Sequence, residues 1–334
     1  MEKETMVGEI NPRYHPTNGS FVVMNVMRMK NLIVALLAFS CLLSCSSPQP
    51  PRQKVIDEGG LGKYPSVVTE DAAFKGYTIY RPADIQQAIA QGPLPLVVFG
   101  NGGCMNTSVY FERFLSEIAS FGYVVIAVGP YHETIEEAQA DEDAAEWTDY
   151  HLLTDAMDLM QKAVKDEKSI FYKAVDMNKV AVMGQSCGGL QALAVSGDTR
   201  VKTTICLNSG VITPTEEQIQ RNLNLVIDKS ALNKLHAPIL YLVGGRTDTA
   251  YENAMDDFLR IDNVFAVIAS DQSGHMGTYA EEFGGAYGQI ALRWLEWHLH
   301  EEEWAESVFI GEECICAYPG WDAQFKNIEK LTLP

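Results

Sequence analysis

The sequence predicts an α/β fold in which helices flank a mostly parallel central sheet of about eight strands. Three observations support this prediction. Short apolar runs alternate with helical patterns along most of the chain, which is typical of βαβ units. The 334 residues, 47% of them hydrophobic, are enough for one large core. Several of the apolar runs lead directly into glycine-rich turns, as strands do at the edge of a sheet.

The expected strands are short and rich in Val, Ile and Leu. Residues 76–80 (GYTIY) read as an early strand that we expect to be antiparallel, and residues 94–99 (LPLVVF) as a fully buried one. Five further runs have the same character: residues 123–128, 179–183, 203–207, 238–243 and 264–269. Helical patterns cover residues 108–120, 147–164 and 191–195, and residues 279–300 contain a long final helix.

The charge balance is strongly acidic, with 44 Asp and Glu against 25 Lys and Arg, a net charge of −19. No basic cluster stands out after the N-terminal segment, so nucleic acid is excluded as an expected partner. Seven of the acids lie within residues 133–146. We interpret them as a solvated helix or loop.

The N-terminal segment predicts export. A basic region around residues 28–30 is followed by a short apolar run over residues 31–43, too short to span a bilayer and typical of a signal peptide. The run ends in Leu42-Leu43-Ser44-Cys45, which resembles a lipobox, so we expect lipidation of Cys45. An ordinary signal peptide with an incidental cysteine is the alternative. Translation is expected to start at Met29, with Met24 and Met27 as rivals.

The expected organisation has one catalytic domain between two terminal segments. A Pro- and Ser-rich stretch after the lipobox favours an extended tether, and residues 211–234 lack a clean period and could form a cap beside the active site. The predicted parts are a signal region at 1–44, a tether at 45–62, the catalytic domain at 63–300, and a tail at 301–334 that packs on the domain.

The strongest motif is Gly184-Gln185-Ser186-Cys187-Gly188, which matches G-x-S-x-G between an apolar strand and a helix. A Ser hydroxyl is a weak nucleophile, so it must be exposed at a sharp turn where a His can reach it. Such a turn crowds its neighbours, which explains the flanking glycines. The sequence therefore predicts that Ser186 is a nucleophile and that the Cys187 N–H faces a developing oxyanion.

An acid and a His follow at the expected places. Asp248 comes after the strand at 238–243, and His275 after the strand at 264–269, in the order Ser, acid, His. We expect His275 to take the proton of Ser186 and Asp248 to orient the imidazole. Rival acids and bases are Asp256, Asp257, Asp271, His132, His298 and His300.

The second oxyanion donor is expected on the loop after residues 94–99, which reads Gly100-Asn101-Gly102-Gly103-Cys104. Its glycines let the backbone approach a ligand closely. We expect the Asn101 amide to be the donor, with Gly102 next and a plain turn as the alternative. Gly102, Tyr131, His132 and Trp147 are candidates for the substrate pocket.

The set FGNGGC, GQSCGG, GGRTD and SGHMGTY resembles the branch of α/β-hydrolases that groups dienelactone hydrolases, chlorophyllases, polyester hydrolases and platelet-activating-factor acetylhydrolases. The resemblance covers about residues 64–300 and implies the α/β-hydrolase fold. It also implies that Ser186, Asp248 and His275 are nucleophile, acid and base, and that Asn101 and Cys187 form the oxyanion hole. Phe99 stands where the family often has His, and a Ser replaces the Cys nucleophile of dienelactone hydrolases.

Five cysteines follow the export segment, and an oxidising compartment would allow disulfides. Since Cys104 follows the oxyanion loop and Cys187 follows the nucleophile, a Cys104–Cys187 bridge could hold both walls of the oxyanion hole. Two buried free thiols are the alternative. Cys314 and Cys316 bridge awkwardly to each other, and no metal site is expected there. Their pairing and that of Cys206 stay open.

The leading functional hypothesis is hydrolysis of carboxylic esters without a metal or organic cofactor. Amide or peptide cleavage by the same residues is the alternative, and a silent glycan-binding lipoprotein is a third. The expected substrate is a small-molecule or polysaccharide-linked ester. The expected location is the periplasmic or outer-membrane face of a bacterial membrane, reached through the lipid anchor.

Overall fold

The computed structural model describes residues 50–212 and 227–331, and residues from Pro51 onward form one compact unit. The signal region, Cys45 and most of the expected cap segment lie outside the described residues. Within these residues no helix is long and apolar enough to cross a membrane.

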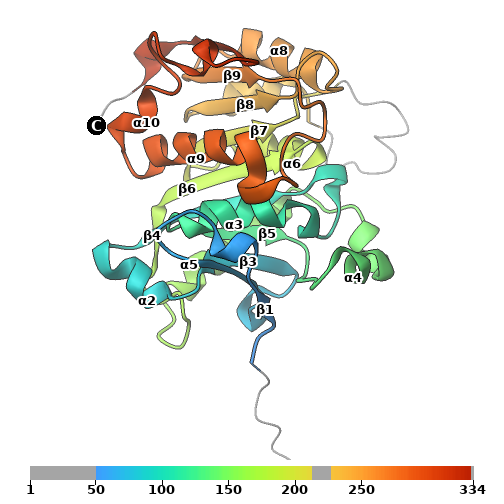
Figure 1. Cartoon of the computed structure of the whole chain (residues 1–334), viewed down its shortest axis with the longest axis vertical. Coiled ribbons are helices and arrows are strands. Elements are labelled where there is room, and N and C mark those ends of the chain that lie inside the picture. The colour runs from blue at the N-terminus through green and yellow to red at the C-terminus, as the bar shows by residue number, and fades with distance from the viewer. Residues whose placement is uncertain (1–49, 213–226, 332–334) are drawn as a thin grey trace, which may run out of the picture. The chain divides into compact units, whose positions relative to one another are not determined.

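A ten-stranded sheet runs through the described part of the chain in the order β1-β2-β3-β5-β4-β6-β7-β8-β9-β10 (Figure 1). The six strands from β5 to β9 in this order are parallel, and the outer strands are antiparallel. The strands are β1 (Gln53–Lys54), β2 (Ser66–Thr69), β3 (Tyr77–Pro82), β4 (Leu94–Gly100), β5 (Val124–Val128), β6 (Val175–Gln185), β7 (Val201–Leu207), β8 (Ile239–Val243), β9 (Ala266–Ser270) and β10 (Asp322–Lys326). This confirms the predicted fold class.

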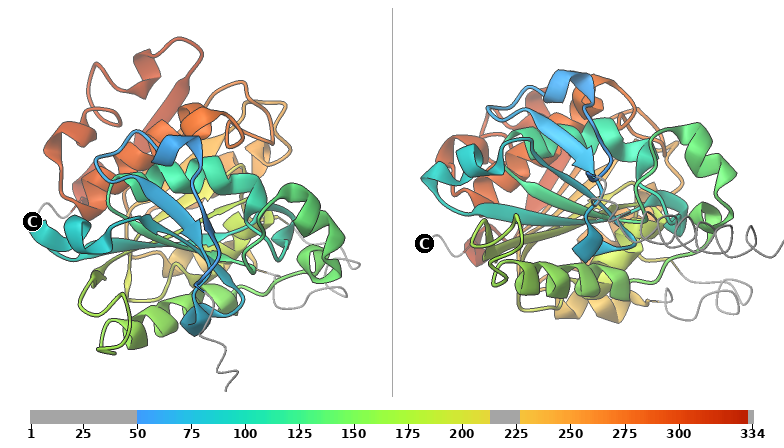
Figure 2. Two further views of the ribbon diagram at one scale, coloured as in Figure 1. Left: turned by 60° about the horizontal axis from the view of Figure 1, so that its bottom comes forward. Right: turned by 90° about the horizontal axis from the view of Figure 1, so that it is seen from below.

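Helices cover both faces of the sheet, as the layers in Figure 2 show. The helices α3 and α9 pack on one face, and α5, α6 and α8 pack on the other. Central strands are therefore buried on both sides, which explains their continuous Val, Ile and Leu. The helices are α2 (Ile85–Ala88), α3 (Glu112–Ser120), α4 (Ile135–Ala140), α5 (His151–Ala163), α6 (Cys187–Val195), α8 (Tyr251–Arg260), α9 (Gly285–Leu299) and α10 (Glu303–Glu306).

The expected terminal segments contribute strands to the sheet. Gln53 and Lys54 of the expected tether pair with β2 as β1, and β10 of the expected tail pairs with β9 along five residues. The tether prediction is therefore wrong for residues 53–54. The error has a physical cause, because β1 has no apolar pattern and is held at the sheet edge by its pairing with β2 and by the ion pair of Lys54 with Glu112.

Two helices are shorter than their sequence patterns predict. The helix expected from residue 147 begins at His151, because Trp147 pairs with Met105 in an isolated bridge and the Thr148 N–H donates to the Cys104 carbonyl. The final helix, expected within residues 279–300, begins only at Gly285. The turn before it contains consecutive positive φ angles at residues 283–285, which no helix tolerates.

The carboxyl ends of β4, β6, β7, β8 and β9 reach the same edge of the sheet, on the right of Figure 1. The loops after these strands carry Asn101, Ser186, Asn208, Asp248 and His275. The parallel topology thus gathers side chains that are far apart in sequence at one edge.

Candidate active site

Ser186 lies in the turn between β6 and α6 with φ 52° and ψ −114°, a conformation that non-glycine residues rarely adopt. The turn depends on close backbone contacts that exclude side chains. A Cβ on Gly184 would lie 2.1 Å from the Gly188 carbonyl oxygen, and a Cβ on Gly188 would lie 2.0 Å from the Gly100 carbonyl oxygen. The flanking glycines of the motif are therefore required by the packing of α6 against β4 and β6.

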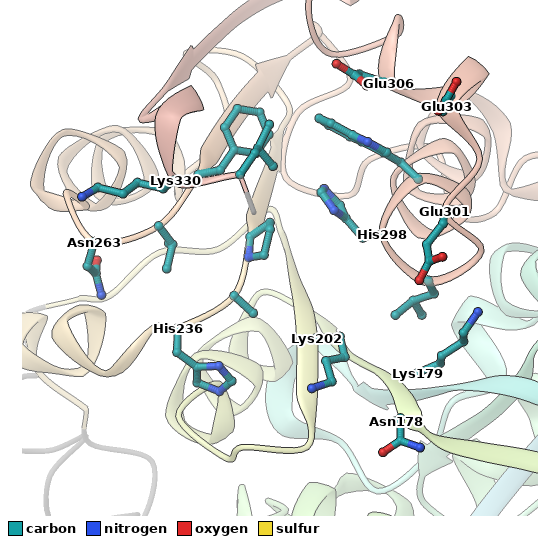
Figure 3. A pocket seen from close by; sticks show the side chains of 17 residues that line it. Asn178, Lys179, Lys202, His236, Asn263, His298, Glu301, Glu303, Glu306 and Lys330 are labelled. Atoms are coloured by element: carbon teal, nitrogen blue, oxygen red, sulfur yellow. The ribbon is translucent and has the colours of Figure 1, made fainter. Parts of the chain in front are cut away.

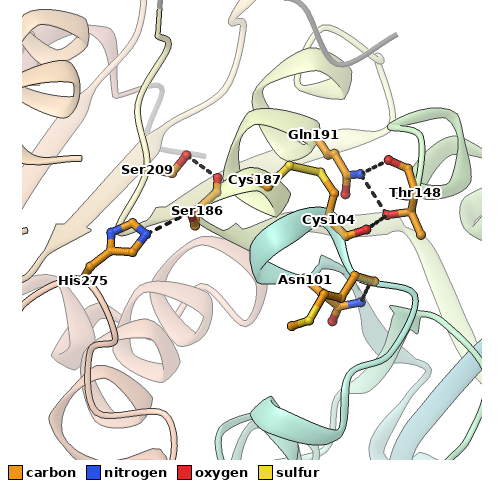
Figure 4. The surroundings of a disulfide bond; sticks show 9 residues. Asn101, Cys104, Thr148, Ser186, Cys187, Gln191, Ser209 and His275 are labelled. Carbon is orange, nitrogen blue, oxygen red and sulfur yellow. Dashed lines mark hydrogen bonds between the residues drawn. A yellow bond between two sulfur atoms is a disulfide. The ribbon is translucent and has the colours of Figure 1, made fainter. Parts of the chain in front are cut away.

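His275 reaches Ser186 from the loop after β9 (Figure 4). Its Nε2 lies 2.9 Å from the Ser186 Oγ, and its Nδ1 lies 2.6 Å from Oδ1 of Asp248. The loop is fixed on both sides, since the Gly274 N–H donates to Gly244 and the side chain of Gln185 donates to the His275 carbonyl at 3.0 Å. The three predicted residues thus form one hydrogen-bonded chain.

The side chain of Asp248 is fully buried and accepts four hydrogen bonds. Its Oδ1 accepts from His275 and, at 2.9 Å, from the Ala250 N–H. Its Oδ2 accepts from the Asn208 amide at 2.8 Å and the Gly244 N–H at 3.0 Å. Burial alone would raise the pKa of this carboxyl group, but the four hydrogen bonds outweigh it and lower the pKa of Asp248 to about 2.

The rival acids have other partners. Asp256 and Asp257 lie on α8 and pair with Lys229 at 2.9 and 2.5 Å. Asp271 accepts from the hydroxyl of Ser273 within its own loop. Asp248 is therefore the acid that the structure places against His275.

Two backbone amides near Ser186 are the candidates for contacting a ligand there. Cys187 is the first residue of α6, so its N–H has no acceptor within the helix. Asn101 directly follows β4, where Gly100 contacts Gly188 at the start of α6. The Asn101 side chain is buried and donates to the carbonyls of Met105 and Val128, so it shapes the loop and leaves the backbone amide as the candidate donor.

A disulfide joins the two loops that carry these amides, with Cα atoms of Cys104 and Cys187 5.1 Å apart (Figure 4). The Cys104 carbonyl also accepts from the Thr148 hydroxyl at 2.9 Å. Gln191 on α6 donates to the Thr148 carbonyl at 2.8 Å. The loop after β4 is therefore bound to α6 by one covalent bond and a hydrogen-bond network.

Of the four predicted pocket residues, Gly102 is buried in the turn after β4, and the other three divide into two groups. Tyr131 and His132 are 2% and 5% exposed. His132 bonds to the hydroxyl of Thr107 and the carboxylate of Asp141, each at 3.0 Å. These contacts hold the loop before α4. Both residues also line a surface hollow of about 390 Å³ together with Arg52 and Asp141, and their part in substrate binding stays a prediction. Trp147 is 47% exposed beside the oxyanion loop and remains available to a ligand.

The three remaining cysteines in the described residues differ in their bonding. Cys314 and Cys316 form a second disulfide, although the spacing made such a bridge look awkward. Cys206 on β7 is a buried free thiol, and burial raises its pKa well above the ordinary range.

A groove of about 650 Å³ lies at the opposite, amino-terminal ends of the strands (Figure 3). Lys179, Lys202, His236, His298 and Glu301 line it. None of the residues predicted for the catalytic site or the oxyanion hole lines this groove. His298, a rival base in the sequence, is thus remote from Ser186, and burial lowers its pKa to about 3. Among the described residues no group of His, Cys, Asp and Glu could hold a metal ion.

Sequence reasoning missed Asn208, Ser209 and Gln185. Asn208 holds Asp248, and the Ser209 hydroxyl donates to the Ser186 carbonyl at 2.6 Å. Asn208 and Ser209 could have been found from their position in the sequence, since they directly follow the predicted strand at 203–207.

The fold is that of the α/β-hydrolases. Residues 54–213 match the family model described as Chlorophyllase, a family of this superfamily. The match agrees with the α/β-hydrolase fold of the chain, and it indicates a hydrolase of ester bonds. The matched range contains Asn101 and Ser186 and ends before Asp248 and His275. No curated protein matches the chain.

Proposed function

We propose that this protein is a serine esterase that cleaves carboxylic esters through an acyl-enzyme on Ser186. The observation that carries the proposal is the hydrogen-bond chain from the Ser186 Oγ through His275 to Asp248. Such a chain lets an imidazole remove the hydroxyl proton while a carboxylate stabilises the imidazolium.

The reaction begins when the Ser186 Oγ attacks the ester carbonyl carbon and His275 Nε2 takes its proton. The tetrahedral intermediate collapses as the same nitrogen returns the proton to the leaving alcohol. Water then attacks the acyl-enzyme by the same route. Because its pKa is lowered to about 2, Asp248 stays ionised. It accepts the hydrogen bond of His275 Nδ1–H throughout the reaction.

The negative charge on the carbonyl oxygen would be stabilised by the Cys187 and Asn101 N–H groups. Removing one such donor typically costs about 10²- to 10³-fold in kcat. The Cys104–Cys187 disulfide supports this role, since it ties together the two loops that carry the donors. A donor pair held in place before the reaction needs no reorganisation during it.

Turnover of short p-nitrophenyl esters tests the proposal. The Ser186→Ala variant should lose about 10⁴-fold or more in kcat. Ser196→Ala removes a buried hydroxyl at the other end of α6 and should keep wild-type kcat. Matched p-nitroanilides, run in parallel, should turn over far more slowly than the esters. Wild-type ester turnover by Ser186→Ala would refute the mechanism, and faster anilide cleavage would favour an amidase.

We propose further that the enzyme is exported and anchored to a bacterial membrane through a lipid on Cys45. The support is the sequence Leu42-Leu43-Ser44-Cys45 after a short apolar run. In this setting the substrate is a small-molecule or polysaccharide-linked ester. Labelling of growing cells with an alkyne fatty acid should tag the wild type and leave Cys45→Ala untagged. Equal tagging of both would contradict the anchor.

A further inference from the structure

The Asn208 side chain links two loops at the active-site edge. Its Nδ2 donates to Oδ2 of Asp248 at 2.8 Å, after β8, and to the Gly274 carbonyl at 3.0 Å, after β9. Gly274 directly precedes His275. One amide therefore fixes the position of the acid relative to that of the base.

The orientation of this amide is dictated by its partners. A carboxylate and a carbonyl can only accept hydrogen bonds, so the NH₂ group of Asn208 must face Asp248 and Gly274. Its Oδ1 then accepts from the hydroxyl of Tyr279. Asn208 is fully buried, with φ 42°, a left-handed conformation that Asn tolerates better than most residues.

Tyr279 is held in turn by aromatic rings. Phe111, Phe114 and Tyr287 meet its ring edge-on, with centroids 5.3 to 5.4 Å away. Burial raises the pKa of Tyr279 well above its usual value, so its hydroxyl keeps its proton and donates. The contacts run without a break from this cluster through Asn208 to Asp248.

From these contacts we infer that Asn208, oriented by Tyr279, is a positioning residue that holds Asp248 against His275. This inference rests on the proposed esterase activity. It extends the hydrogen-bonded chain Ser186–His275–Asp248 by two residues, neither of which touches the substrate.

The first test compares kcat and KM for p-nitrophenyl acetate in three variants. Asn208→Leu keeps the volume and removes the amide, and Tyr279→Phe removes one oxygen atom. Losing a hydrogen bond to a buried charged group should lower kcat on the order of 10- to 100-fold in Asn208→Leu, with KM nearly unchanged. Tyr279→Phe should lower kcat severalfold. The double variant should be no worse than Asn208→Leu alone, because Tyr279 acts through Asn208.

Thr203→Val is the matched control. Thr203 is fully buried near the start of β7, the strand that Asn208 directly follows, and it bonds to Trp294 and the Pro238 carbonyl. This variant should lose thermal stability and keep wild-type kcat per folded molecule. Loss of kcat in Thr203→Val as large as in Asn208→Leu would show a structural effect and overturn the inference.

A pH profile separates positioning from packing. In Asn208→Asp the new carboxyl group faces the Asp248 carboxylate, and only its protonated form can donate as the amide does. The ratio of kcat/KM for Asn208→Asp to that for Asn208→Leu should therefore rise as pH falls. Other ionisable groups near this position are Asp271, His275, Tyr279, Tyr287 and Cys206. Dividing by the Asn208→Leu profile removes their shared contributions.

The outcomes distinguish the inference from the proposed function. If Ser186→Ala is inactive while Tyr279→Phe and Asn208→Leu keep wild-type kcat, the positioning role is overturned and the esterase stands. If Ser186→Ala stays active, the proposed function itself fails. Should Asn208→Leu not fold, Tyr279→Phe decides, because the loss of one oxygen leaves its aromatic packing intact.

Discussion

The sulfur of Cys187 is bonded to that of Cys104, 83 residues earlier in the chain. Cys187 follows Ser186, and Cys104 lies on the loop after β4, so the bond joins one expected oxyanion donor to the loop that carries the other. The stability and the geometry of the site therefore depend on the same covalent contact.

Breaking this disulfide should destabilise the protein and slow it. For a loop of this length, the double variant Cys104→Ser/Cys187→Ser should lose about 4 kcal/mol of unfolding free energy, measured by urea denaturation. Its kcat should fall because the two loops can separate. The control is Cys314→Ser/Cys316→Ser, whose bridge spans two positions and should matter far less. A larger loss in the control would contradict this account.

Asp248→Asn should lower kcat by about 10⁴-fold, because the imidazole loses the carboxylate that sets its tautomer and stabilises its charge. Steady-state ester kinetics measure the effect. Asp256→Asn is the matched control, since Asp256 is a half-exposed carboxylate on α8 that pairs with Arg260. It should keep wild-type kcat. Equal losses in the two variants would remove Asp248 from its role.

The lowered pKa of Asp248 also predicts a pH dependence of stability. The group has a pKa of 3.8 without the fold and about 2 within it, so the unfolded chain binds the proton first as pH falls. The stabilisation from ionised Asp248 is therefore complete above about pH 4 and is lost as pH falls through 2. The stability difference between wild type and Asp248→Asn should shrink by about 2 kcal/mol from pH 5 to 2. A constant difference in denaturation experiments would contradict the lowered pKa.

Trp147 and His132 should respond differently to truncation. Trp147→Ala removes a half-exposed ring beside the oxyanion loop and should raise KM for aromatic esters on the order of tenfold with little loss of stability. His132→Ala breaks one buried and one partly buried hydrogen bond and should cost about 2 kcal/mol of unfolding free energy. Thermal melts and ester kinetics on both variants measure this. The reverse pattern would place His132 in the pocket.

The sequence predicted those parts of the fold and site that local patterns encode. The buried strands were visible as apolar runs, and Ser186 was visible because its turn demands glycines on both sides. Strand order then located Asp248 and His275.

Features that depend on tertiary contacts were not visible in the sequence. The strands β1 and β10 are held at the sheet edges by pairing and carry no strong apolar pattern. Trp147 has a helical pattern but pairs with Met105 instead. Asn208 bonds to residues on the loops after β8 and β9. These contacts form only in the folded protein, and no local sequence pattern predicts them.

Covalent labelling with a fluorophosphonate, followed by peptide mapping, tests the central claim most directly. The reagent phosphonylates a serine hydroxyl only where a neighbouring base activates it. We expect one adduct per molecule, on the peptide containing Ser186, and none in Ser186→Ala or His275→Ala. An unlabelled wild-type protein, or an adduct on another serine that persists in Ser186→Ala, would contradict the account.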